Sequence, residues 1–80
     1  MKSELYYEVY AKRCELIGWI IEDLALSATA NGKYEQFHLQ RVGIFEFLEQ
    51  DSLTLMDLRE YWQTTEFYEL LKLFDLLPGQ

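Results

Sequence analysis

The sequence has little of several residues on which small proteins rely for staples or for chemistry. Its 80 residues include one cysteine, one histidine, one proline and four glycines. Cys14 cannot form a disulfide within the chain, and one Cys with one His is too few for the four ligands of a structural zinc site. A catalytic Cys14–His38 pair would need hydrogen-bond contact, whereas Cys14 falls in a predicted core stripe where a buried, inert thiol is expected.

Motifs that carry a recognisable chemistry are also missing. The sequence contains no glycine-rich phosphate loop, nucleophile elbow, calcium loop or Glu-x-x-His metal motif. Glutamates recur at helical spacing at 46 and 49 and at 66 and 69, which we interpret as solvated helix faces. We therefore expect no catalytic residues, no metal site and no cofactor. A metal-binding or enzymatic protein is the least favoured of three hypotheses.

Basic residues are few, at 7 against 14 acidic ones, which gives a net charge of −7. Such a chain repels phosphates, so direct nucleic-acid binding and attachment to anionic membranes are both disfavoured. No apolar run approaches the roughly 20 residues that span a bilayer. The first ten residues also lack the apolar core of a signal peptide. We expect a cytoplasmic protein.

Hydrophobic residues make up half of the sequence and aromatic residues 16%, enough to build a core. The length predicts a single domain over residues 1–80. Residues 3–30 predict one long helix, with Ser3 as N-cap and Asn31-Gly32 as the stop. Its apolar stripe has 3-4-3-4 spacing and comprises Tyr7, Tyr10, Cys14, Ile17, Ile21, Leu24 and Ala28.

This helix would be about 40 Å long, whereas a compact domain of this size is roughly 30 Å across. It must therefore overhang, bend near Gly18, or be covered by a second chain. Three shorter helices are expected over 34–50, 54–63 and 65–77. Thr54 with Asp57 predicts a capping box, Thr65 is expected to cap the last helix, and Pro78-Gly79 to end it. The predicted fold is all-α, an irregular four-helix domain.

The side of the long helix opposite its core stripe is less polar than a solvated face should be. Trp19 and Leu26 fall there beside Glu15 and Glu22, with Leu16 at the edge. Either other helices of the chain cover this side, or these five residues form a partner-binding surface. Arg41 lies within the apolar stripe of residues 34–50, and we expect it to form an intramolecular salt bridge.

The leading hypothesis is a non-catalytic acidic protein-binding module. It would be an adaptor, assembly factor or inhibitor acting on a larger protein with a basic surface, of the kind that phages and other mobile elements carry. Acidic charge would speed its encounter with such a surface. The alternative is a structural homodimer built on the N-terminal helix.

Overall fold

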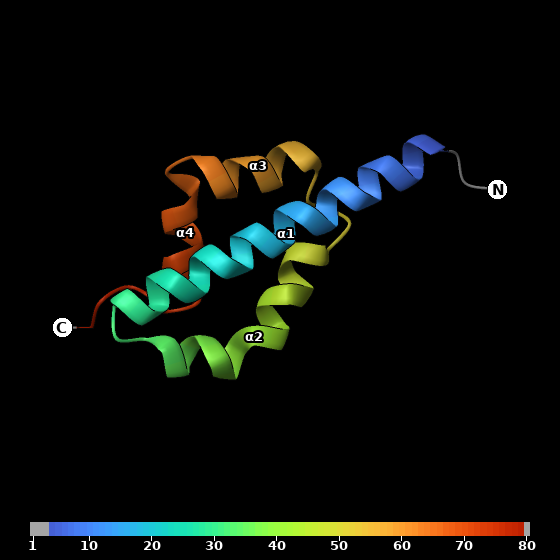
Figure 1. Cartoon of the computed structure of the whole chain (residues 1–80). Helices are drawn as coiled ribbons and strands as arrows, with labels where there is room; N and C mark the ends of the chain where they lie inside the picture. Colours follow the sequence, from blue (N-terminus) through green and yellow to red (C-terminus); the bar gives the residue numbers. More distant parts are fainter. Residues whose placement is uncertain (1–3, 80) are drawn as a thin grey trace.

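The computed structural model describes residues 4–79, apart from the side chain of Glu4, and consists of four helices (Figure 1). Their bounds are α1 Glu4–Ala30, α2 Tyr34–Glu49, α3 Leu55–Gln63 and α4 Glu66–Leu73. The predicted all-α fold, with one long N-terminal helix and three shorter ones, is confirmed. The expected Ser3 cap and the Glu4 side chain lie outside what the structure describes.

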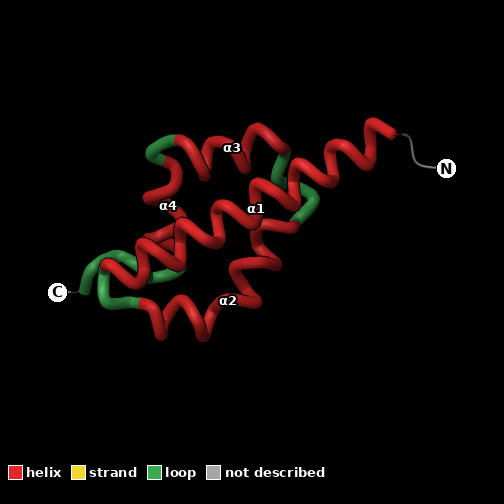
Figure 2. The backbone as a smooth tube through the Cα atoms, in the orientation of Figure 1, coloured by secondary structure: helices red, strands yellow, loops and turns green. Residues whose placement is uncertain are grey.

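The long helix α1 lies at the centre of the fold. α2 runs along one side of it and α3 along the other, and α4 turns back toward the C-terminal end of α1 (Figures 1 and 2). The first turns of α1 project beyond all the other helices, and the molecule measures 51 × 23 × 18 Å. Of the three arrangements expected to accommodate the length of this helix, the single chain shows the overhang. α1 continues through Gly18 without a break.

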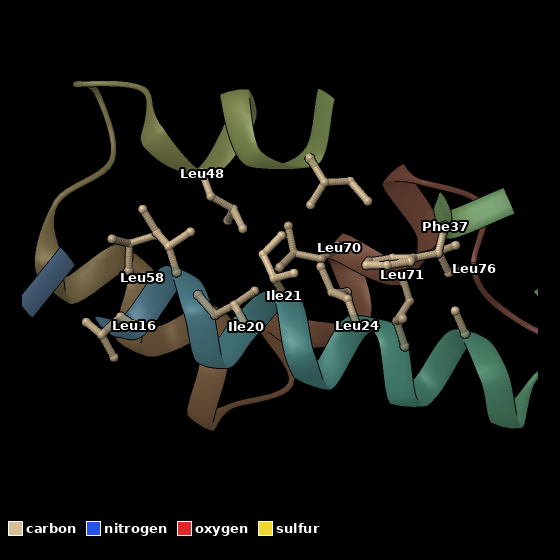
Figure 3. Close-up of a cluster of buried hydrophobic side chains, with 13 residues drawn as sticks. Leu16, Ile20, Ile21, Leu24, Phe37, Leu48, Leu58, Leu70, Leu71 and Leu76 are labelled. Carbon is tan, nitrogen blue, oxygen red and sulfur yellow. The ribbon is translucent and has the colours of Figure 1, made fainter. Parts of the chain in front are cut away.

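The core is formed where α1 is flanked by the other helices (Figure 3). Its members are large aliphatic residues, with one phenylalanine and one alanine: Leu16, Ile17, Ile20, Ile21, Leu24, Ala28, Phe37, Ile44, Leu48, Leu58, Leu70, Leu71 and Leu76. The predicted stripe of α1 is thus buried from Ile17 onward. Its first members, Tyr7, Tyr10 and Cys14, are exposed, so the expectation of a buried Cys14 is wrong. These residues precede the point where α2 and α3 begin to cover α1.

The Asn31-Gly32 stop signal works as expected. Gly32 has a φ of 70°, the left-handed conformation that glycine adopts at little cost. The amide of Lys33 donates to the carbonyl of Ala28 at 2.7 Å, and that of Gly32 donates to Thr29 at 3.2 Å. These two bonds define a Schellman motif, which satisfies carbonyls that the helix end would otherwise leave unpaired.

The Thr54–Asp57 capping box is confirmed at the start of α3. The hydroxyl of Thr54 accepts from the amide of Asp57 at 3.1 Å, and the Asp57 carboxylate accepts from the amide of Thr54 at 2.9 Å. Thr65 makes no such bond, because its backbone is already helical. The extended Thr64 instead accepts from the amide of Glu66 at 3.1 Å and donates to the carbonyl of Glu60 at 2.6 Å.

α4 ends at Leu73, earlier than the expected stop at Pro78-Gly79. Asp75 adopts a φ of 56°, and the amide of Leu76 donates to the carbonyl of Leu71 at 2.7 Å, which forms a second Schellman motif. Because the chain leaves the helix here, Leu76 becomes part of the core, where it is fully buried. Burial of one leucine contributes about 1.5–3 kcal/mol, enough to favour this early end over a further turn of helix.

Side chains of α1, of α2 and of the turn between them form hydrogen bonds with the chain segments that follow α2 and α4. The guanidinium of Arg13 donates to the carbonyl of Leu53 and, at 3.1 Å, to that of Gln50, just past the end of α2. Past the end of α4, the Asn31 amide donates to the carbonyl of Leu76 at 2.9 Å, and the Gln40 amide donates to that of Phe74 at 2.6 Å. The carbonyls beyond two helix ends are therefore satisfied by partners remote in sequence.

Candidate protein-binding site

The five residues expected to face a partner do not all lie on the surface. Trp19 is 39% exposed and Leu26 64%, and Glu15 and Glu22 are exposed beside them on α1. Leu16 is only 4% exposed and belongs to the core. It lies on the flank of α1 that faces the other helices, so it is no part of the accessible surface.

Trp19 is neither fully covered nor isolated. Its indole stacks on that of Trp62 in α3, with ring centroids 4.7 Å apart and planes inclined by 29°. Such offset stacking adds about 0.5–1.5 kcal/mol beyond the burial of area. The two rings border a hollow of about 320 Å³ between α1 and α3, whose polar lining includes Arg59 and Gln63. Trp19 is therefore part structural contact and part surface.

A larger, open groove of about 700 Å³ lies between the C-terminal half of α1 and the corner where α3 meets α4. Leu26 lines one wall, and Phe67 and Tyr68 come from α4. Trp62 borders both this groove and the smaller hollow, so the two are adjacent. We call this surface the indole face and define it by Trp19, Leu26, Trp62, Phe67 and Tyr68.

Only part of the indole face was visible in the sequence. The spacing of apolar residues makes Trp62 and Phe67 core residues of their own helices. In the structure both are only partly buried. Tyr68 lies on the polar side of α4 and is exposed. No sequence signal showed that it would line the same groove as Leu26, because this arrangement depends on the turn at Thr64-Thr65, which directs α4 back toward α1.

The charges around the indole face favour an acidic border. Glu15 is paired with Lys12 at 3.6 Å, an exposed ion pair that contributes little. Among the described residues, no cation lies within ion-pair distance of Glu22 or Asp23, and Asp23 lines the groove beside Leu26. Arg59 and Lys12 are the cations that line the smaller hollow.

Other candidate groups do not come together. His38 stacks on Tyr34 in the first half of α2, with centroids 6.2 Å apart, and no hydrogen bond joins it to Cys14 on α1. Residues 4–79 contain no group of three His, Cys, Asp or Glu side chains that could hold a metal ion. The expected salt bridge of Arg41 is wrong, since this side chain is exposed and pairs with no carboxylate of the described chain.

The chain matches no known protein family, and no characterised protein or solved structure is significantly similar to it. None of the helices in the described part of the chain has the length and apolar character required to cross a membrane. Function must therefore be argued from the surface of this molecule alone.

Proposed function

We propose that the chain is a non-catalytic, acidic protein-binding module of the cytoplasm, whose binding site is the indole face. Its partner is a larger protein that presents an apolar side chain within a basic surface. An adaptor, an assembly factor and an inhibitor would all use such a contact.

The observation that carries the proposal is the exposure of Leu26 beside three aromatic rings in an open groove. Tryptophan and tyrosine are the side chains that most often supply binding energy at protein interfaces. The groove is open rather than enclosing, so it suits a side chain projecting from a protein better than a free small molecule. The Trp19–Trp62 stack holds one wall in place, which reduces the entropy lost on binding.

Charge supports the choice of a basic partner. Asp23 lines the apolar groove and Glu22 precedes it on α1, neither carboxylate pairs with a cation of the described chain, and the protein as a whole carries −7. A basic surface would be attracted over a distance of about one Debye length, about 8 Å at physiological ionic strength. This attraction would raise the association rate more than it would slow dissociation.

The experiment compares three baits in a lysate of the native host: the wild type, Leu26→Asp and Leu39→Asp. Leu39 is the matched control, since it is a 75% exposed leucine on the outer side of α2, away from the groove. A protein captured by the wild type and Leu39→Asp, and lost with Leu26→Asp, would be purified and titrated by calorimetry. We expect Leu26→Asp to weaken its binding at least about tenfold, and added salt to weaken it further. Capture that is equal with Leu26→Asp, or is abolished by Leu39→Asp, would refute the indole face as the site.

A further inference from the structure

The projecting turns of α1, residues 5–14, carry a second apolar surface, separate from the indole face. Its large side chains are all exposed: Leu5, Tyr6, Tyr7, Val9 and Tyr10. Tyr10 lies two turns before the buried Ile17 on the same face of α1, and Tyr6 one further turn before Tyr10. This surface therefore continues the core-facing stripe past the end of α2, and α2 borders it only through Phe45 and Glu49 (Figure 1).

The surface borders a preformed hollow. A cavity of about 430 Å³ lies between these turns and the C-terminal end of α2. Tyr6, Val9 and Tyr10 of α1 line it together with Phe45 and Glu49 of α2 and with Asp51. Arg13 at its base is fixed by its bonds to the carbonyls of Gln50 and Leu53. These hydrogen bonds tie one residue of the lining to the segment that follows α2.

We infer that this surface pairs with the same surface of a second copy of the chain, in a two-fold symmetric dimer. In this dimer the projecting turns of the two α1 helices lie antiparallel, with the symmetry axis beside Val9. Tyr6 and Tyr10 of each copy pack against the turns of the other. A self-complementary patch of this kind is what a two-fold dimer requires.

The geometry of the overhang favours a second copy as the occupant. An antiparallel pairing about Val9 brings the N-terminal end of one α1 opposite Cys14 of the other, next to Glu49. The positive end of the helix dipole then lies near Glu49 and Asp51, two carboxylates that share the lining of the cavity with one cation, Arg13. Glu49 is also close enough to Tyr10 to contribute to the raised pKa of its phenol, after the larger effect of a hydrogen bond to Cys14.

The available area sets the strength of the dimer. Tyr6 and Tyr10 are 43% and 58% exposed, and the five side chains together offer on the order of 500 Å² per copy. Two copies would bury at most about 1,000 Å², at the low end of specific interfaces, so a weak, concentration-dependent dimer is expected. Each copy carries −7, so added salt should strengthen the dimer by screening repulsion, opposite to its effect on binding of a basic partner.

Sedimentation equilibrium of the purified full chain tests the association. Between about 5 µM and about 500 µM, the wild-type mass should rise from 9.6 kDa toward twice that value, and rise further in high salt. Tyr10→Asp should remain monomeric, while Leu39→Asp should behave as the wild type. Circular dichroism must show that both variants are folded. A wild-type mass that stays at 9.6 kDa throughout, or a rise that Tyr10→Asp leaves unchanged, would overturn the inference and leave this surface to another protein.

Cross-linking tests the arrangement of the two helices. The antiparallel pairing places the two Cys14 residues about 15 Å apart along the helix axes, too far for a disulfide. The two copies of residue 9 lie at the axis. Mild oxidation should therefore link Val9→Cys in a Cys14→Ser background into dimers, whereas the wild type should remain unlinked. If the wild type links as fast as the Val9→Cys variant, the antiparallel arrangement is wrong.

Discussion

Replacing Trp19 by alanine should destabilise the fold substantially, although this side chain is partly exposed. With 39% of Trp19 exposed, about three-fifths of its surface is buried. A tryptophan buries up to about 250 Å², so this corresponds to about 150 Å², or about 3–4 kcal/mol at about 25 cal/mol per Å². The unfolded chain already hides part of that area, and alanine retains some contacts, so we expect a loss of about 2–3 kcal/mol.

Urea denaturation followed by circular dichroism at the helix band measures this loss without relying on the altered tryptophan fluorescence. For a domain of this size, a loss of about 2–3 kcal/mol lowers Tm by about 10–20 °C. Leu26→Ala is the matched control: Leu26 is on the same helix and 64% exposed, so its replacement should change stability by less than about 0.5 kcal/mol.

A double-mutant cycle isolates the contribution of the ring stack. Trp19→Ala and Trp62→Ala should be coupled by about 0.5–1.5 kcal/mol, because each ring provides the surface on which the other packs. Additive effects, or a loss below about 0.5 kcal/mol for Trp19→Ala alone, would refute the stacking geometry. Such a result would mean that Trp19 is surface only.

Three further predictions concern helix ends and pH. In the same denaturation assay, Thr54→Ala should destabilise the fold by about 1 kcal/mol because it removes a capping bond. Thr65→Ala removes no such bond, so it should change stability by less than about 0.5 kcal/mol. Asp75→Gly should keep or raise Tm and Asp75→Ala should lower it, since alanine tolerates the left-handed conformation least; equal Tm values would contradict the φ of 56°. Burial, and then the charges of Glu66, Asp57 and Glu69, raise the pKa of Tyr61 above its ordinary value of 10.0. The unfolded phenol ionises first, so the contribution of Tyr61 to stability is complete below pH 10 and lost above it, and Tyr61→Phe should flatten this alkaline loss in a pH series of urea titrations.

Most of the fold could be predicted because its signals are local. The 3-4 spacing of apolar residues predicts α1, and Asn31-Gly32 and the Thr54–Asp57 box mark helix ends through bonds that span only a few residues. The error at α4 has a nonlocal cause. Proline and glycine at 78–79 are a local stop signal, but the core takes up Leu76 and ends the helix before that signal is reached.

The candidate site was less accessible to prediction for the same reason. A helical wheel correctly separates Trp19 and Leu26 from the core stripe, since that depends on α1 alone. It cannot show which side chains a neighbouring helix covers. Leu16 was therefore assigned to the partner-binding surface, although the other helices bury it. Trp62 and Tyr68 join the site only through the direction of α3 and the turn into α4, which Thr64 fixes with two hydrogen bonds.

The two apolar surfaces have one physical origin. α1 is 27 residues long, whereas α2 has 16 and α3 only 9, so the shorter helices cannot cover the whole apolar surface of the long one. The uncovered part divides into the projecting turns, which extend past the end of α2, and the indole face, where α3 covers Trp19 only in part. Since these lie at different ends and on different sides of α1, a charge placed at Tyr10 should leave partner binding intact. A charge placed at Leu26 should likewise leave self-association intact.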